Sequence, residues 1–208
     1  MANIIFDFDG TIADSFDYVL DFLCAEAGKP EGFAREGAAD YRHLSMKDIA
    51  LKLGIPIWKL PYVYFKGRRV MRKHVLHVEP FVGMPELIRR LASQGHHLSI
   101  ISANSTKNIR IFLRERRLEA DFRVVRGGAG VLGKVLPIRR LKHKFKTDEC
   151  WYVGDEVSDM LSAKAARVRS IGVTWGFATR EELQYAGSEV IVDEPASIEA
   201  AILSQSTK

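Results

Sequence analysis

Residues 3–11 of this 208-residue chain read Asn-Ile-Ile-Phe-Asp-Phe-Asp-Gly-Thr. The first half is apolar and shows no clean alternation with polar residues, which is typical of a strand buried on both faces of a parallel sheet. Asp7 and Asp9 stand two residues apart, so they share one side of the extended chain, and Gly10 lets the chain turn at once. Such a pair can belong to a plain turn or a helix cap. Because like charges repel, it also suits a site where a cation neutralises them.

Similar apolar segments recur along the chain and alternate with helical patterns. The strands are predicted at Asn3–Phe8, His97–Ser102, Asp121–Val125, Cys150–Gly154, Ser170–Val173 and Glu189–Val192. The helices between and after them are predicted at Met84–Ser93, Thr106–Arg117, Lys134–Lys146, Ser158–Ala166 and Arg180–Ala186. This alternation predicts an α/β fold with a Rossmann-like, doubly wound parallel sheet, which binds ligands at the carboxyl ends of its strands.

The segment 15–79 interrupts the alternation, because nothing in it predicts a strand. Its helical patterns lie at Phe16–Ala27, Met46–Leu53 and Tyr62–Val78. We therefore expect an inserted α-helical domain of residues 15–79 and an α/β core domain of residues 1–14 and 80–208.

A second group of acids follows the strand predicted at Cys150–Gly154. Residues 154–159 read Gly-Asp-Glu-Val-Ser-Asp, and a helix starting there places Asp155 and Asp159 one turn apart. Helix capping would explain one acid, but not a triplet opposite another acid pair. Several carboxylates at neighbouring strand ends suit a hard cation. Mg²⁺ is the natural choice, because it takes a few carboxylates together with water and substrate phosphate oxygens.

Two further places can supply contacts to phosphate. The stretch Ser102-Ala103-Asn104-Ser105 ends a predicted strand and opens a helix, so a hydroxyl and backbone N–H groups meet a helix N-terminus. A plain helix cap is the alternative there. Lys134 follows the glycine-rich segment 127–133 and could approach both a phosphate and a carboxylate, although by itself it would be an ordinary surface lysine.

Together these four places resemble the haloacid dehalogenase superfamily of Mg²⁺-dependent phosphohydrolases. The matching motifs are DFDGT at residues 7–11, the strand-end Ser102, Gly133-Lys134, and GDEVSD at residues 154–159. Their order and spacing match over essentially the whole chain. The helical insert resembles the cap domain of the phosphoglycolate phosphatase and β-phosphoglucomutase subgroup. Ser102 stands where threonine is commoner, and its hydroxyl can do the same work.

The resemblance implies that Asp7 is the nucleophile and forms an aspartyl-phosphate. Asp9 would protonate the leaving oxygen and then activate the water that hydrolyses the intermediate. Dehalogenases of this superfamily lack the second acid, so Asp9 argues against dehalogenation. The resemblance further implies that Mg²⁺ is held by Asp7, Asp155 and the backbone carbonyl of Asp9, with Asp159 orienting its waters. The phosphate-binding residues implied are Ser102, Ala103, Asn104 and Lys134.

We therefore predict a phosphatase of a small phosphorylated metabolite, most like phosphoglycolate. The segment 41–47 is the candidate specificity element, in which Arg42 or Lys47 would recognise the far end of the substrate; the residues by themselves favour solvated helix ends over this role. The alternatives are a phosphoglucomutase-like phosphotransferase, a sugar-phosphate phosphatase and, as the least favoured, a non-enzymatic binding protein.

The net charge of +5 does not indicate a nucleic-acid partner. Residues 66–73 and 139–146 carry five Lys or Arg each and no acid, and removing these ten of the 31 bases leaves 21 against 26 acids. The basicity is thus local and favours solvated helix faces, with attraction of anions as the alternative. The longest stretch without Asp, Glu, Lys or Arg is the 16 residues 91–106, too short and polar to span a bilayer. We expect a soluble cytoplasmic protein, monomeric or homodimeric, whose cysteines, Cys24 and Cys150, are small buried hydrophobes.

Overall fold

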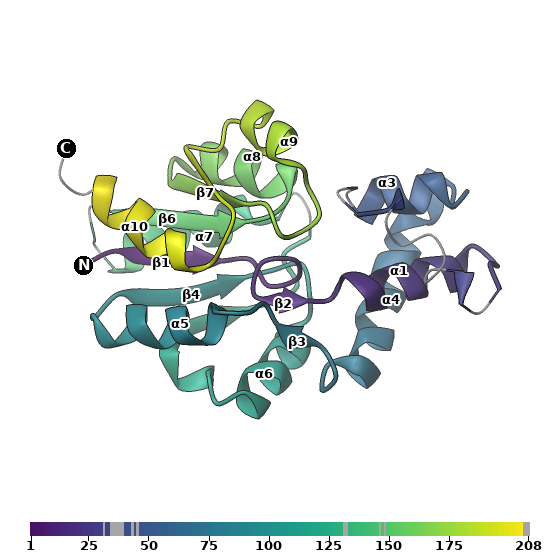
Figure 1. Cartoon of the computed structure of the whole chain (residues 1–208), viewed down its shortest axis with the longest axis horizontal. Coiled ribbons are helices and arrows are strands. Elements are labelled where there is room, and N and C mark those ends of the chain that lie inside the picture. The colour runs from purple at the N-terminus through teal and green to yellow at the C-terminus, as the bar shows by residue number, and fades with distance from the viewer. Residues whose placement is uncertain are drawn as a thin grey trace.

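The computed structural model describes residues 1–30, 32–33, 40–42, 44, 46–130, 133–145, 147 and 149–205. It has an α/β core and a helical insert that projects from one side of it (Figure 1). No helix in this described part of the chain combines the length and the apolar character needed to cross a bilayer.

The core is built on a six-stranded sheet in which every neighbouring pair is parallel. The strand order is β5-β4-β1-β6-β7-β8. The strands are β1 (Asn3–Phe6), β4 (His97–Ile101), β5 (Phe122–Arg126), β6 (Cys150–Gly154), β7 (Arg169–Val173) and β8 (Val190–Val192). From β1 the chain builds outward to β5 on one side and then to β8 on the other, so the predicted doubly wound sheet is confirmed.

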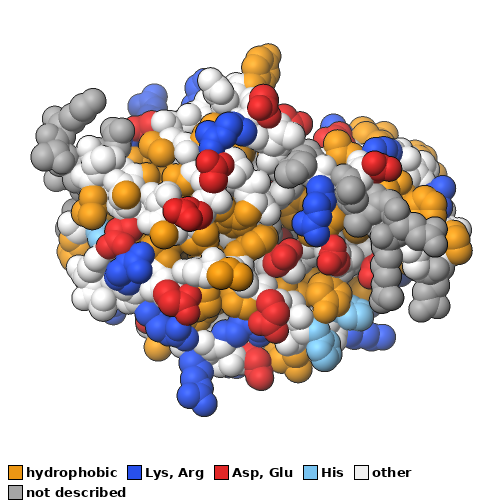
Figure 2. All heavy atoms as spheres, viewed as in Figure 1, with side chains coloured by type: hydrophobic (Ala, Val, Ile, Leu, Met, Phe, Trp, Pro, Cys, Tyr) orange, Lys and Arg blue, Asp and Glu red, His pale blue; other side chains and the backbone are white. Residues whose placement is uncertain are grey.

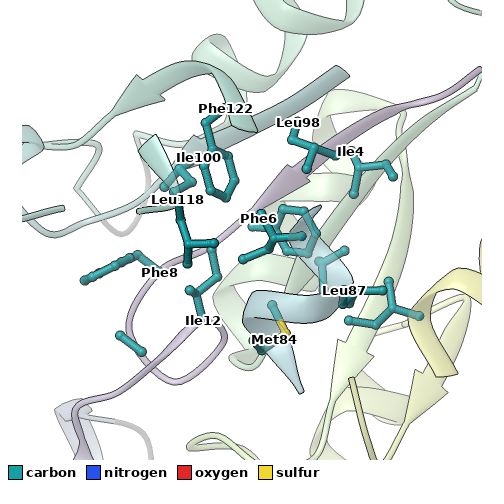
Figure 3. Close-up of a cluster of buried hydrophobic side chains, with 14 of the residues drawn as sticks. Ile4, Phe6, Phe8, Ile12, Met84, Leu87, Leu98, Ile100, Leu118 and Phe122 are labelled. Atoms are coloured by element: carbon teal, nitrogen blue, oxygen red, sulfur yellow. The ribbon is translucent and has the colours of Figure 1, made fainter. Parts of the chain in front are cut away.

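The alternation of side chains along β1 divides the hydrophobic core between the two faces of the sheet. Ile4 and Phe6 face a layer formed by α5 (Met84–Ser93), α6 (Thr106–Glu115) and α10 (Ala196–Gln205), where they meet residues such as Leu87 and Ile100 (Figure 3). Ile5 faces the opposite layer, formed by α7 (Val135–Phe145) and α8 (Val157–Ala166). A strand with apolar residues on both faces is buried on both, as its sequence predicts.

The helices of the core agree with the predictions except at the C-terminal end. There, α9 (Arg180–Tyr185) is as expected, but α10 was not predicted. Ile198 and Ile202 stand four residues apart in α10, and both are buried against the sheet. The two cysteines are buried and unpaired, as expected.

The described elements of the insert include α1 (Phe16–Glu26), α3 (Met46–Lys52), a short 3₁₀ helix η2 (Ile57–Lys59) and α4 (Leu60–His74). Its own apolar cluster includes Leu20, Leu23 and Ile49, and Phe177 of the core joins that cluster. The C-terminal end of α4 packs differently, because Met71 and the following residue Val75 belong to the cluster of the core. The division into residues 15–79 and the remainder stays a prediction.

The insert is connected through a two-stranded antiparallel ribbon, β2 (Ala13–Asp14) and β3 (Glu79–Pro80), which the sequence did not predict. Ala13 pairs with Pro80 and Asp14 with Glu79, so the chain leaves the core and returns to it at neighbouring points. Charged side chains of both signs lie interspersed over the face shown in Figure 2.

Candidate active site

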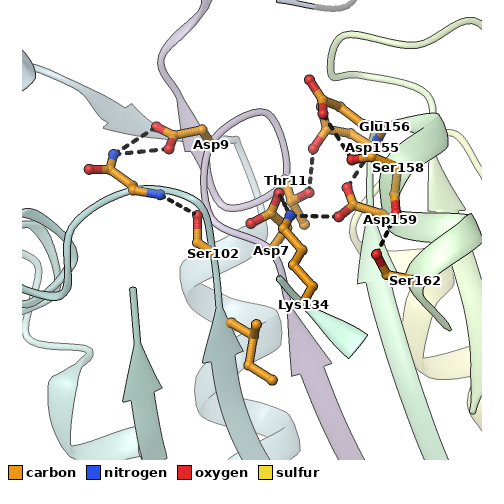
Figure 4. A network of polar contacts seen from close by, with 12 residues as sticks. Asp7, Asp9, Thr11, Ser102, Lys134, Asp155, Glu156, Ser158, Asp159 and Ser162 are labelled. Carbon is orange, nitrogen blue, oxygen red and sulfur yellow. Dashed lines mark hydrogen bonds and ion pairs between the residues drawn. The ribbon is translucent and has the colours of Figure 1, made fainter. Parts of the chain in front are cut away.

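The predicted site residues come together at the carboxyl edge of the sheet, around the middle strand β1. The backbone N–H of Asp7 donates to the carbonyl of Val153 in β6 at 2.8 Å, and Phe6 is level with Ile100 of β4 and with Val153. The acids of residues 7–11 and 154–159 therefore emerge side by side, and the segment after β4 lies on the other side of them (Figure 4). Neighbouring parallel strands that end at one level produce this convergence.

Lys134 lies at the centre of the acids and is not a surface lysine. Its Nζ is 2.7 Å from Oδ2 of Asp7 and 2.7 Å from Oδ1 of Asp159, and only 2% of its side chain is exposed. Burial opposes the charge of Lys134, but the two carboxylates outweigh it and hold the pKa of the ammonium well above its usual value. Lys134 is therefore a fixed positive charge beside Asp7.

One oxygen from each of Asp7, Asp155 and Asp159 lies within 4.8 Å of the others. Burial raises the pKa of Asp7 to about 7, although Lys134 opposes the rise. Burial, together with the charges of Asp159 and Glu156, raises the pKa of Asp155 well above its usual value. Ionisation of Asp7 and Asp155 together would therefore leave buried negative charge that Lys134 alone does not neutralise.

These residues fit a divalent cation. Oδ1 of Asp7 is buried and has no hydrogen-bond partner in the described part of the chain, while Oδ2 is taken by Lys134. The available donors are carboxylate oxygens, which Mg²⁺ prefers over softer ligands. Both oxygens of Asp159 are engaged, one by Lys134 and one by the backbone N–H of Glu156 at 3.1 Å. Both oxygens of Asp155 also accept hydrogen bonds, so the place of Asp159 behind the metal ligands stays a prediction.

Asp155 is fixed by a set of contacts that sequence reasoning missed. Thr11 donates its hydroxyl to Oδ1 of Asp155 at 2.7 Å, and the backbone N–H of Phe177 donates to Oδ2 at 3.0 Å. Gly10 and Gly176 approach so closely that a Cβ on either would lie 2.1 Å or 2.3 Å, respectively, from Oδ2 of Asp155. Gly10 also has a φ of +75°, which favours glycine. The glycines are there because the carboxylate leaves no room for a side chain.

Asp9 points away from Lys134, toward the segment that follows β4 (Figure 4). The side-chain amide of Asn104 donates to both of its oxygens, at 2.9 Å to Oδ2 and 3.2 Å to Oδ1. Burial raises the pKa of Asp9, and the hydrogen bonds from Asn104 partly oppose the rise. Asp7 and Asp9 are thus held by different partners despite their proximity in sequence.

The segment from Ser102 to Ser105 opens α6 as predicted. The hydroxyl of Ser105 accepts from the backbone N–H of Asn108 at 3.1 Å and caps the helix. The hydroxyl of Ser102 accepts from the backbone N–H of Asn104 at 3.2 Å, so that N–H, predicted as a phosphate contact, has a protein partner here. The role of Ser102, Ala103 and Asn104 in phosphate binding stays a prediction. The contact of the Asn104 side chain with Asp9 was missed, because the sequence singled out only the backbone of this segment.

The predicted specificity residues lie on the insert and do not contact the acid cluster. The Arg42 guanidinium lies 4.7 Å from the ring centroid of Phe16 and 3.6 Å from Oδ1 of Asp17. The centroid of the Phe16 ring in turn lies 5.7 Å from that of Phe177, the residue whose backbone N–H holds Asp155. Arg42 is therefore connected to Asp155 only indirectly, through the rings of Phe16 and Phe177. Lys47 is exposed on α3. His43 and Ser45 of the same predicted element lie outside the described residues.

The chain is similar to known proteins along most of its length. The family model of haloacid dehalogenase-like hydrolases matches residues 4–173. A phosphoglycolate phosphatase of Synechococcus elongatus is 31% identical over 212 residues, which cover 97% of each chain. A solved haloacid dehalogenase-like hydrolase from Streptococcus pneumoniae superposes with a TM-score of 0.75 at 18% identity, covering 97% of this chain and 98% of its own. A hydrolase from Pseudomonas syringae has a TM-score of 0.72 at 19% identity, covering 98% and 99%. The chain belongs to the haloacid dehalogenase-like hydrolase family and is a hydrolase of phosphoric monoesters.

Proposed function

We propose that the chain is a Mg²⁺-dependent phosphatase of a small phosphorylated metabolite of the phosphoglycolate kind, acting through an aspartyl-phosphate on Asp7. The observation that carries the proposal is the state of the Asp7 carboxylate. Lys134 holds one of its oxygens, while the other is buried without a partner among the described residues. A carboxylate is an adequate nucleophile toward phosphorus when it is held in line with a phosphoryl group whose charge is neutralised.

In the first step Asp7 attacks phosphorus and the bond from phosphorus to the leaving oxygen breaks. Asp9 gives that oxygen its proton, so the product leaves as an alcohol. The raised pKa of Asp9 supports this role, because burial favours the protonated form that can donate. In the second step Asp9 takes a proton from water, the resulting hydroxide attacks phosphorus, and inorganic phosphate leaves Asp7 free again.

The remaining residues neutralise charge and hold position. Asp7, Asp155 and the backbone carbonyl of Asp9 would hold Mg²⁺, which supplies positive charge next to the phosphoryl group. Lys134 supplies a second, permanent positive charge on Asp7. Positive charge fixed before the reaction begins is commonly the largest contribution to phosphoryl transfer. Ser102, Ala103 and Asn104 would contact the phosphoryl oxygens.

The substrate class is proposed from the relatives and from the insert. The relative from Synechococcus elongatus is named a phosphoglycolate phosphatase. Phosphoglycolate carries a carboxylate at its far end, and Arg42 or Lys47 on the insert offers the opposite charge. Direct release of inorganic phosphate, rather than its transfer to a second hydroxyl of a sugar phosphate, separates this proposal from a phosphoglucomutase-like reaction.

Two variants test the assignment of the two acids. Asp7→Asn should abolish the first step on every ester. Asp9→Asn keeps the nucleophile and should slow the first step of phosphoglycolate by about 10²–10⁴-fold, the usual worth of general acid catalysis. The same variant should slow p-nitrophenyl phosphate much less, because p-nitrophenolate leaves as a stable anion.

The measurement is a single turnover under excess enzyme, by quenched flow for phosphoglycolate and by p-nitrophenol absorbance for the aryl ester. Steady-state rates would hide the first step, because loss of the base also slows dephosphorylation. Asp21→Asn, which removes an exposed acid on α1, is the control. Substantial turnover by Asp7→Asn, or an equal slowing of both esters by Asp9→Asn, would contradict the proposed roles.

A further inference from the structure

Two buried asparagines connect Asp9 to the insert. The Asn104 side chain donates to Asp9, as described above, and its Oδ1 accepts from Nδ2 of Asn108 at 3.0 Å. The same Nδ2 of Asn108 donates to the backbone carbonyl of Arg68 at 2.8 Å. Arg68 lies in the middle of α4, the long helix of the insert, which packs against α6 of the core. An unbroken line of hydrogen bonds therefore runs from the insert to the Asp9 carboxylate.

The neighbouring groups fix the orientation of both amides. Oδ1 of Asn104 accepts from the backbone N–H of Ser105 at 2.7 Å as well as from Asn108, so its NH₂ group must face Asp9. The Asn108 amide contacts two carbonyl oxygens, one on the Asn104 side chain and one on the Arg68 backbone. Carbonyl oxygens only accept hydrogen bonds, so the NH₂ group of Asn108 must face them. Neither amide can flip without losing every one of these bonds.

The Asn108 side chain lies in the interior of the protein. It is fully buried, and its Oδ1 has no partner in the described part of the chain. A buried polar atom without a partner is costly, and an apolar side chain of the same shape would avoid that cost. Asn3 shares these properties, so what distinguishes Asn108 is where its NH₂ group donates, to Asn104 of the core and to the backbone of α4 in the insert.

We propose that Asn104 and Asn108 are positioning residues that couple the docking of α4 on α6 to the orientation of the Asp9 carboxylate. When α4 lies against α6, the Arg68 carbonyl and Asn104 together hold the Asn108 amide in place. That amide holds the plane of Asn104, which presents its NH₂ group to both oxygens of Asp9. Movement of the insert therefore changes the orientation of the Asp9 carboxyl, which protonates the leaving oxygen. This inference rests on the proposed function of Asp9.

Asn108 provides the sharper test, because it contacts neither Asp9 nor the acid cluster. Asn108→Leu keeps the approximate shape and removes both donors. We expect the single-turnover rate of phosphoglycolate hydrolysis to fall about tenfold more than that of p-nitrophenyl phosphate hydrolysis. Only phosphoglycolate hydrolysis depends on the orientation of the Asp9 carboxyl toward the leaving oxygen. Asn104→Leu should shift this rate ratio further in the same direction. A loss of folded protein would slow both esters equally and leave the ratio unchanged.

Asn3 offers a matched control. It is also fully buried, its Oδ1 has no partner among the residues that the structure describes, and its Nδ2 donates to the backbone carbonyl of Leu141 at 3.2 Å, far from the insert. Asn3→Leu should leave the ratio of the two rates as in the unmodified protein. Hydrogen exchange of the backbone amides of residues 60–74 should become faster in Asn108→Leu and stay unchanged in Asn3→Leu. The reason is that only Asn108→Leu removes a hydrogen bond between α4 and the core.

Combination with Asp9→Asn separates this inference from the proposed function. If Asp9→Asn alone leaves the rate ratio unchanged, the acid role of Asp9 is wrong. If Asp9→Asn shifts the ratio but Asn108→Leu does not, the coupling is wrong while the proposed function stands. In the double variant, Asn108→Leu should add nothing to the shift made by Asp9→Asn, because both act through one carboxylate. Additive shifts would overturn the coupling.

Discussion

Asp7→Asn should stabilise the metal-free protein at pH 8, although it destroys the proposed nucleophile. In the folded protein, burial raises the pKa of Asp7 from 3.8 to about 7. Folding therefore favours the protonated form, and the stability that this form contributes is present below pH 4 and is lost as the pH rises toward 7. At pH 8 the carboxylate must be buried with its charge. Asparagine imitates the neutral form at every pH.

The magnitude follows from the size of the shift. One pKa unit corresponds to about 1.4 kcal/mol, so a shift of this size makes ionised Asp7 cost up to about 4 kcal/mol of folding free energy at pH 8. The difference in the free energy of unfolding between Asp7→Asn and the unmodified protein should therefore grow from nearly zero at pH 4 to this value at pH 8. With a urea m-value of about 2 kcal/mol per molar, the midpoint at pH 8 should rise by up to about 2 M.

The assay is urea unfolding followed by circular dichroism in EDTA, at pH 4, 6 and 8. Asp9 and Asp155 titrate in both proteins, so their contributions cancel to first order. Asp17→Asn removes an exposed charge and should leave the midpoint unchanged at all three values. Added Mg²⁺ should stabilise the unmodified protein and not Asp7→Asn, because ligand binding to the native state alone raises stability. A difference that stays constant with pH, or a less stable variant at pH 8, would refute the reasoning.

Three further expectations concern the metal and the substrate. Activity should disappear in EDTA and return with Mg²⁺, whereas Ca²⁺ should suppress it, because a larger ion with more ligands can draw both oxygens of Asp7 into coordination; full activity in metal-free buffer would contradict this. Gly176→Ala should weaken Mg²⁺ binding at least tenfold in a calorimetric titration, because its Cβ would collide with Asp155; unchanged affinity would mean that Asp155 is not a ligand. Arg42→Ala should lower kcat/KM at least tenfold for phosphoglycolate, about 1.4 kcal/mol of transition-state binding, and change p-nitrophenyl phosphate hydrolysis little; equal losses would place Arg42 in cap closure or folding.

The parts of the molecule that sequence could predict are those set by local pattern. β1 was recognisable because its apolar residues supply both faces of the sheet at once. The convergence of Asp7 and Asp155 followed from one rule, that parallel strands end at a common edge. Lys134 was recognisable only in combination with these acids, since nothing local distinguishes it from a surface lysine.

The parts that sequence could not predict are set by tertiary contact. Each strand of the ribbon β2–β3 has two residues, too few to show any period. Gly176 and Phe177 hold Asp155 from a neighbouring loop, and no spacing along the chain reveals that approach. Asn104 has a backbone N–H and a side-chain amide, and only the fold decides which of them meets Asp9. A signal for α10 was available in the spacing of Ile198 and Ile202.

The ribbon that joins the insert to the core brings the two ends of the insert together. Residues 14 and 79 face each other in the ribbon, so the 64 residues between them form an excursion with entrance and exit at one place. Because the two ends of this excursion lie beside each other, its length could vary without separating the two core segments that it joins. Its packing is less independent, since Met71 of α4 belongs to the core cluster and Phe177, which holds Asp155, belongs to the cluster of the insert. A change at the interior face of the insert therefore reaches the acid cluster, whereas a change in its length need not.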